Sequence, residues 1–150
     1  MLLYLDLNCF NRPFDDQAQA RVAAETHAVF LILERIEEGA DELVWSSALT
    51  FENSRHPLQD RRIEIARWEQ RAVTIVRVSD EMVQRAGELV NAGFRALDAA
   101  HLAFAECANC RRFLTCDDRL FRMARRVQLN VTVQNPVEYA EEIGDDRTTR

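Results

Sequence analysis

Short apolar segments typical of β-strands alternate along the chain with longer segments of helical periodicity. Strands are predicted at residues 2–7, 42–47, 73–78, 112–115 and 130–133, and the main helices at 18–38, 58–71, 80–91, 98–108 and 117–126. Alternation of this kind favours right-handed crossovers and a parallel sheet covered on both faces. The sequence therefore predicts an α/β fold of three α/β/α layers around a central, mainly parallel sheet.

Length and composition indicate one domain. The chain has 150 residues and is 47% hydrophobic, which suits one globular unit with a substantial core. We expect a single domain over residues 1–143 and a flexible tail over 144–150. No apolar stretch approaches the roughly 20 residues that a membrane span needs, and no signal peptide is recognisable. These features predict a cytoplasmic protein that does not enter membranes.

The charge balance bears on possible partners. The formal net charge is -6, and all 19 basic side chains are arginine. An acidic protein is an unusual nucleic-acid binder, because phosphate affinity normally rests on basic surface. Much of the negative charge, however, lies in residues 37–42 and 138–146, where it need not meet a substrate. The negative net charge therefore disfavours a nucleic-acid substrate but does not exclude one.

Four acidic residues follow predicted strands or begin predicted helices. Asp6 comes directly after the first strand, and Asp117 follows the fourth; Glu52 lies in a short helix after the second strand, and Asp98 begins an apolar helix. In parallel sheets, ligands bind beyond the carboxyl ends of the strands. Asn8, two residues after Asp6, is placed to orient that carboxylate. We therefore expect the acids to face one crevice.

Each of these residues also has a purely structural interpretation. Asp6, Asp98 and Asp117 suit turn or helix-capping positions, and a helical glutamate such as Glu52 is usually solvated. His101, three residues after Asp98, is more often a hydrogen-bonded core residue than a metal ligand. The four acids together are less easily explained in this way.

Clustered carboxylates suggest a particular chemistry. They repel one another, and a divalent cation such as Mg²⁺ or Mn²⁺ relieves that repulsion while activating water for phosphodiester hydrolysis. The chain lacks the sequence motifs of two other catalytic mechanisms. The chain has no lysine for a phosphate-binding P-loop and no G-x-S-x-G nucleophile turn. The sequence thus predicts a metal site formed by Asp6, Glu52, Asp98 and Asp117.

Four ordered motifs resemble those of PIN-domain proteins, especially the VapC-like toxins of type II toxin–antitoxin systems. They are L-D-L-N at residues 5–8, S-A-L-T-F-E at 47–52, L-D-A-A-H-L-A-F-A at 97–105 and F-L-T-C-D-D at 113–118. The resemblance implies a PIN-like fold and a Mg²⁺- or Mn²⁺-dependent endoribonuclease that acts on RNA. It assigns catalytic and metal-binding roles to the four acids, and it implies a cognate antitoxin and a homodimer.

The chain departs from the family pattern at two positions. Leu7 stands where a Ser or Thr often follows the first Asp, and Arg119 stands where a further acid is often found. Asp118 is a candidate to replace that acid. Arg12, in the loop after the first strand, is a candidate to contact an RNA phosphate.

Two other functions remain open from the sequence. One is a non-catalytic PIN-like module that binds RNA or protein. The other is a metal-dependent DNA nuclease or phosphatase that uses the same carboxylates.

Overall fold

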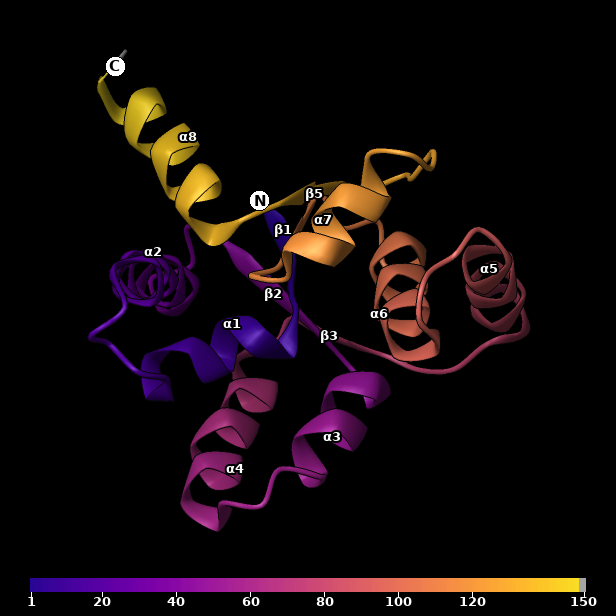
Figure 1. The fold of residues 1–150 in the computed structure, drawn as a ribbon, viewed down its shortest axis with the longest axis horizontal. Coiled ribbons are helices and arrows are strands. Elements are labelled where there is room, and N and C mark those ends of the chain that lie inside the picture. The colour runs from indigo at the N-terminus through magenta and orange to yellow at the C-terminus, as the bar shows by residue number, and fades with distance from the viewer. Residues whose placement is uncertain (149–150) are drawn as a thin grey trace.

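A parallel β-sheet forms the centre of the protein, seen in a computed structural model that describes residues 1–148 (Figure 1). Its strands are β1 (Leu2–Leu5), β2 (Glu42–Ser46), β3 (Thr74–Val76), β4 (Arg112–Leu114) and β5 (Thr132–Gln134). They are arranged in the order β3-β2-β1-β4-β5, and every neighbouring pair is parallel. The predicted α/β fold is confirmed, and the sheet is parallel throughout.

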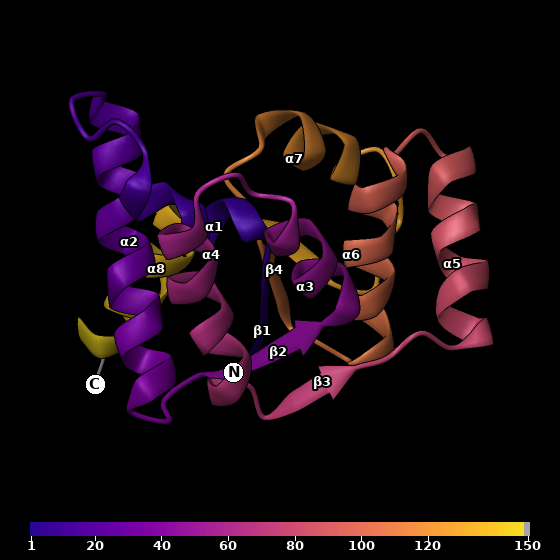
Figure 2. The same ribbon diagram turned by 90° about the horizontal axis from the view of Figure 1, so that it is seen from below.

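Helices cover both faces of the sheet. They are α1 (Leu7–Asn11), η1 (Arg12–Phe14), α2 (Ala20–Glu37), α3 (Ser47–Ser54), α4 (Gln59–Ala66), η2 (Arg67–Arg71), α5 (Asp80–Asn91), α6 (Ala96–Cys107), α7 (Asp118–Ala124) and α8 (Pro136–Thr148). Figures 1 and 2 show α2 and α8 on one side of the sheet and α6, backed by α5, on the other. This gives the three layers expected from the sequence.

The central strand β1 is buried on both faces. Leu3, Tyr4 and Leu5 are completely inaccessible to solvent, which explains why the segment is a continuous apolar run rather than an alternating one. Burial of each leucine side chain contributes about 2 kcal/mol. The residue that follows this rigid strand is therefore held in a fixed place.

Strand order places a switch point beside β1. The chain passes from β1 to β2 on one side, whereas β4 pairs with β1 on the other side. Crossovers diverge there, and ligands bind at such points in open parallel sheets. Asp6 follows β1, and Asp117 comes three residues after β4, at the same edge of the sheet.

The region after the first strand differs from the sequence prediction. The first strand ends at Leu5, and Leu7 already belongs to α1 because Asp6 caps this helix. The helix α8 continues to Thr148 into the stretch 144–150, for which a flexible tail is predicted, and the last two residues lie outside the described part of the chain. Tyr139 and Ile143 on α8 are buried, so this helix packs on the domain.

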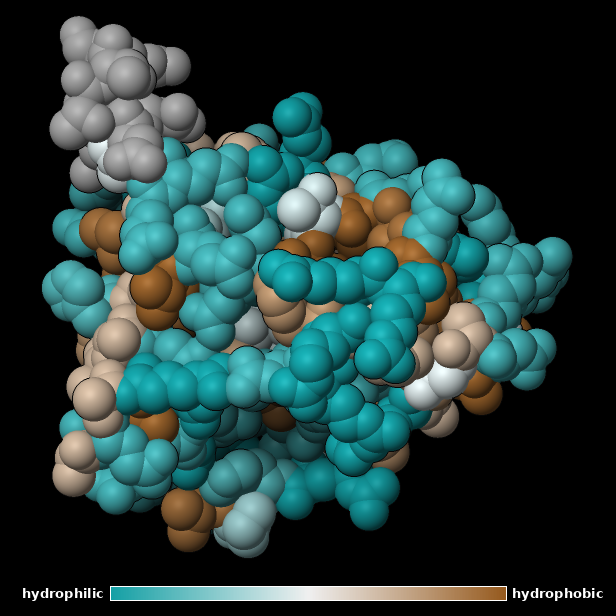
Figure 3. All heavy atoms as spheres, turned by 45° about the horizontal axis from the view of Figure 1, so that its top comes forward, coloured by the Kyte–Doolittle hydropathy of each residue, from teal (hydrophilic) through white to brown (hydrophobic). Residues whose placement is uncertain are grey.

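The surface is mainly polar. Figure 3 shows hydrophilic side chains over most of one face, with hydrophobic groups visible between them. Across the described residues, every helix is too short or too polar to cross a membrane.

Candidate metal centre

All four predicted acids line one pocket at the carboxyl edge of the sheet. Asp6, Glu52, Asp98 and Asp117 surround a cavity of about 630 Å³, together with Asn8. They come from the end of β1 and from α3, α6 and the turn before α7. The fold thus brings together residues that lie as far as 111 positions apart in the sequence.

Asp6 is fixed by hydrogen bonds to both carboxylate oxygens. The backbone N–H of Leu7 donates to Oδ1 at 2.8 Å. Through this bond Asp6 acts as the N-cap residue of α1. The Thr115 hydroxyl donates to Oδ2 at 2.9 Å, and Asn8 Nδ2 donates to the same oxygen at 3.1 Å. The capping and site interpretations of Asp6 are therefore compatible.

Thr115 is a member of the site that the sequence reasoning did not single out. Its hydroxyl oxygen also accepts hydrogen bonds from Asn8 Nδ2 and from the Asp117 N–H, each at 3.1 Å. Asn8 Oδ1 in turn accepts from the Cys116 N–H at 3.0 Å. These bonds tie the end of β1 to the turn after β4. In the sequence, the T-x-D pattern at residues 115–117 is the feature that points to Thr115 as a site residue.

Asp117 and Asp98 hold different positions on their helices. Asp117 caps α7, with its Oδ1 accepting from the N–H groups of Arg119 and Leu120. Asp98 lies in the first turn of α6 rather than at the N-cap, which Arg95 occupies. Burial, followed by the negative charge of Asp117, raises the pKa of Asp98. A cation in the pocket would offset both effects.

A tighter cluster joins two of the pocket acids to the buried side chain of His101. Asp6, Glu52 and His101 each present a ligand atom, and these atoms all lie within 4.8 Å of one another. Burial, together with the charge of Glu52, raises the pKa of Asp6 to about 6, although His101 acts in the opposite direction. Burial alone would lower the pKa of His101, but Glu52, Asp6 and Asp98 raise it. Two carboxylates and an imidazole form a donor set suited to a divalent metal.

Two further candidates from the sequence are engaged elsewhere. Arg12 pairs with the buried carboxylate of Glu25 at 2.9 Å and with Asp15 at 3.1 Å. Asp118 is exposed and forms a two-pronged ion pair with Arg21, at 2.5 and 2.7 Å. Neither side chain lines the acidic pocket. The roles suggested for Arg12 and Asp118 therefore gain no support from the geometry.

Other arginines line the pocket instead. Arg55, Arg61 and Arg95 lie along its wall with His56. Arg61 is bound to Asn11 and Asp15, whereas Arg55 and Arg95 are exposed and belong to no ion pair among residues 1–148. Guanidinium groups beside an acidic centre that are not engaged in ion pairs within the described chain are suited to an anionic substrate.

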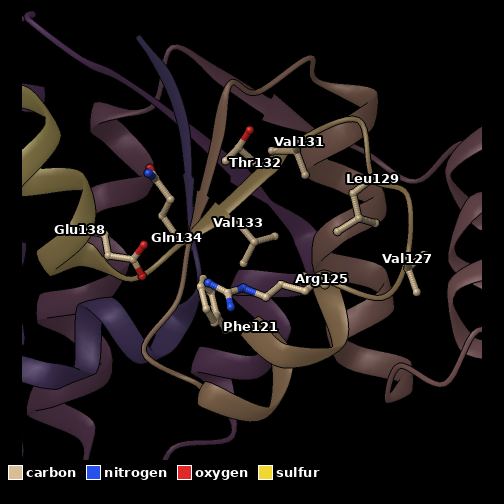
Figure 4. A pocket seen from close by; sticks show the side chains of 10 residues that line it. Phe121, Arg125, Val127, Leu129, Val131, Thr132, Val133, Gln134 and Glu138 are labelled. Atoms are coloured by element: carbon tan, nitrogen blue, oxygen red, sulfur yellow. The ribbon is translucent and has the colours of Figure 1, made fainter.

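A separate hollow lies at the β5 edge, away from the acids. It has a volume of about 360 Å³ and is bounded by β5, α7 and the 126–131 loop. Figure 4 shows Arg125 beside Phe121 in this hollow, and the guanidinium carbon lies 4.6 Å from the ring centroid. Its aliphatic lining, which includes Val131 and Val133, contains no cluster of metal-ligating groups.

Comparisons with known proteins agree with this architecture. The family described as PIN domain matches residues 3–126. The structure is similar to VapBC2 from Rickettsia felis bound to a DNA fragment from its promoter, with a TM-score of 0.60 and 14% identity over 90% of this chain and 98% of the matched chain. It is also similar to VapBC-1 from nontypeable Haemophilus influenzae, with a TM-score of 0.60 and 15% identity over 91% and 98% of the two chains. A comparison with curated proteins finds no relative in sequence.

Proposed function

The chain belongs to the PIN domain family, and we propose that it is a metal-dependent endoribonuclease. The observation that carries this proposal is the pocket lined by Asp6, Glu52, Asp98 and Asp117. Carboxylates gathered at the switch point of a parallel sheet are suited to holding Mg²⁺ or Mn²⁺ next to a phosphodiester.

Asp6 and Glu52 would hold the ion, with Asp98 and Asp117 at its periphery. A bound divalent ion supplies a water of lowered pKa and stabilises charge that develops on the phosphoryl oxygens. The chain itself supplies orientation. Thr115 and Asn8 fix the Asp6 carboxylate, and such supporting bonds are needed to keep a ligand in its productive geometry.

Two exposed arginines would position the substrate. Arg55 and Arg95 line the same pocket as the acids and have no competing ion pair within the described chain. Each guanidinium can bind phosphate oxygens with two parallel hydrogen bonds. The phosphate to be cleaved would then lie between these cations and the metal site.

The proposed biological role is that of a toxin held inactive by an antitoxin. The two similar structures described above are of VapBC2 and VapBC-1. A groove of about 450 Å³ offers a binding surface, and it is lined by apolar side chains with three acids: Phe10, Pro13, Phe14, Phe30, Leu33, Ile65 and Trp68 with Glu34, Glu37 and Glu64. Such a groove suits an amphipathic segment with basic flanks.

A homodimer is proposed as the assembly state. Five exposed valine and isoleucine side chains lie between the residue before β3 and the end of α5, namely Val73, Ile75, Val78, Val83 and Val90. They are 44–62% exposed. Apolar side chains concentrated on one part of a surface often mark an interface.

Cleavage of single-stranded RNA tests the proposed activity. We expect purified protein to cut RNA with Mg²⁺ or Mn²⁺ and to lose this activity in excess EDTA. Asp6→Asn should reduce the rate at least 100-fold, because it removes one anionic ligand from the site. Asp80→Asn, an exposed acid on α5, is the control and should retain full activity.

The alternatives give different results in the same assay. Cleavage of DNA or phosphomonoesters without cleavage of RNA would replace the ribonuclease proposal. Metal-independent RNA binding without turnover would instead indicate a non-catalytic module.

A further inference from the structure

The side chain of His101 has an unusual environment beside the pocket acids Asp6 and Glu52. It is 1% exposed, and its Nε2 is one of two buried side-chain polar atoms in the described chain without a hydrogen-bond partner; the other is Asn53 Oδ1. An unpaired buried nitrogen costs about 1–3 kcal/mol. A bound ligand at Nε2 would remove this cost.

His101 Nε2 is directed at the carboxylate cluster. It lies 3.4 Å from Glu52 Oε1, without the alignment of a hydrogen bond. The ligand atoms of Asp6, Glu52 and His101 lie within 4.8 Å of one another. Two donors bound to one ion at about 2.0–2.2 Å are about 3.0–3.5 Å apart. The spacing between His101 and Glu52 therefore matches that of two ligands of one ion.

The other ring nitrogen sets the orientation of the imidazole. His101 Nδ1 lies 2.6 Å from the Tyr4 hydroxyl, which lies 2.6 Å from Ser46 Oγ. Tyr4 and Ser46 belong to adjacent strands, β1 and β2, and both side chains are buried. The ring is thus held against the rigid centre of the sheet rather than against a mobile loop.

This hydrogen-bond chain is compatible with the tautomer that a metal ligand requires. If Nδ1–H donates to Tyr4 and the tyrosine hydroxyl donates to Ser46, the lone pair of Nε2 faces the carboxylates. The opposite proton order would place a hydrogen on Nε2, which makes no hydrogen bond to Glu52. The first arrangement is the one used by metal-binding histidines, whose second nitrogen is fixed by a neighbouring group.

We propose that His101 is a nitrogen ligand of the ion held by Asp6 and Glu52, and that the centre therefore selects Mn²⁺ over Mg²⁺. This inference rests on the proposed metal site and adds its composition and selectivity. Magnesium binds oxygen ligands almost exclusively, whereas Mn²⁺, although it also favours oxygen, is a transition-metal ion that accepts an imidazole nitrogen more readily. A mixed nitrogen and oxygen site consequently discriminates against Mg²⁺.

Pulsed EPR of the Mn²⁺-loaded, tag-free wild-type protein tests the ligand directly. We expect nitrogen hyperfine coupling from one imidazole, which changes on ¹⁵N-histidine labelling. His101→Gln should lose this signal. His56→Gln should retain it, although His56 lines the acidic pocket. Because the wild type itself gives the readout, absence of nitrogen coupling from bound Mn²⁺ overturns the inference even if the variant fails to fold.

Calorimetry tests the selectivity. We expect His101→Gln to weaken Mn²⁺ binding by about 10–100-fold and Mg²⁺ binding by much less. Tyr4→Phe, which removes the partner of Nδ1, should weaken Mn²⁺ binding about tenfold. The exposed His27, changed to Gln, should have no effect. Equal losses for Mg²⁺ and Mn²⁺ in His101→Gln would contradict the claim of selectivity.

RNA cleavage separates this inference from the proposed function. A wild-type protein that cuts RNA with Mn²⁺ but lacks nitrogen coupling retains the function and refutes the role of His101. A protein that binds Mn²⁺ through His101 but leaves RNA intact supports the ligand and refutes the ribonuclease. Failure to bind Mn²⁺ at all would refute both.

Discussion

The carboxylate of Asp6 is stabilised and destabilised by the same surroundings. It receives three hydrogen bonds, from Leu7, Thr115 and Asn8, yet it is only 5% exposed and lies beside Glu52. The pKa of Asp6 rises from 3.8 to about 6, chiefly through burial. In the absence of a bound cation, burial and the charge of Glu52 therefore disfavour the ionised carboxylate more than the hydrogen bonds favour it.

Asp6→Asn should stabilise the metal-free protein. A folded-state pKa above the unfolded value means that stability falls as pH rises from about 4 to about 6, and the full penalty is present at pH 7. The rise to about 6 corresponds to about 3 kcal/mol. The asparagine amide cannot accept all the hydrogen bonds that the carboxylate accepts, which offsets part of this gain. We therefore expect the variant to be more stable than the wild type by about 1 kcal/mol. Urea unfolding in EDTA at pH 7 measures it.

Saturating Mn²⁺ provides the control for this prediction. The ion should stabilise the wild type by mass action and the variant much less, so the order of stability should reverse. A variant that is less stable than the wild type in EDTA would contradict the proposed penalty.

Sequence reasoning located residues whose position follows from strand ends. Asp6 and Asp117 were found because parallel strands present their carboxyl ends at one edge. The ion-pair partners of Arg12 and Asp118, namely Glu25 and Arg21, are contributed by α2 and do not follow from strand ends. Sequence proximity carries no information about such tertiary ion pairs.

At the scale of elements, the sequence identified the strands and long helices but overlooked α1 and α8. The helix α1 has only five residues, and its apolar side chains resemble a continuation of the strand. The acidic composition of α8 resembles a solvated tail, whereas the structure buries Tyr139 and Ile143. The residues of α8 pack against α2, and this tertiary contact explains why they form a helix.

A buried network anchors α8 to the rest of the domain. The Tyr139 hydroxyl and Arg35 Nε each donate to Asp41 Oδ2 at 2.8 Å, and Asp41 is 1% exposed. Burial alone would raise the pKa of Asp41, but the bonds from Arg35 and Tyr139 lower it. The network joins α8, α2 and the segment before β2.

Asp41→Asn should destabilise the protein by about 3 kcal/mol at pH 7, because Arg35 loses its anionic partner in a buried position. A lowered folded-state pKa gives stability that is complete above about pH 4 and is lost as pH falls through the folded value. The deficit of the variant should therefore shrink at strongly acidic pH. Urea unfolding at pH 7 and pH 3 measures this change, with the exposed Asp60→Asn as control. An equal deficit at both pH values would show that the charge is not responsible.

At the scale of the whole molecule, a net charge of -6 must be reconciled with an RNA substrate. The local distribution resolves the conflict. Arg55 and Arg95 are exposed at the acidic pocket, and a metal ion would neutralise part of the negative charge there. Affinity for phosphate depends on these local cations more than on the total.

The double variant Arg55→Gln/Arg95→Gln should weaken RNA binding and make its salt dependence shallower. Loss of two phosphate contacts reduces the log–log slope by about 1.4 for a single strand. Fluorescence anisotropy in an Asp6→Asn background measures binding without cleavage. Arg71→Gln/Arg111→Gln makes the same change in net charge at exposed positions that precede β3 and β4, at the opposite edge of the sheet. An equal effect of this control pair would indicate nonspecific attraction instead of a defined phosphate path.

Two apolar surfaces on the molecule are assigned to different partners, and matched substitutions can separate them. Phe30 in the acid-rimmed groove and Val83 on α5 are almost equally exposed, at 57% and 55%. Phe30→Asp should weaken binding of the antitoxin, because it places a charge in an apolar contact, and should leave the homodimer intact. Val83→Asp should produce a monomer that still binds the antitoxin. Sedimentation of each variant, alone and mixed with the proposed antitoxin, measures both assemblies. Because each variant is the control for the other, loss of both assemblies in either one would mean that the two surfaces are not independent.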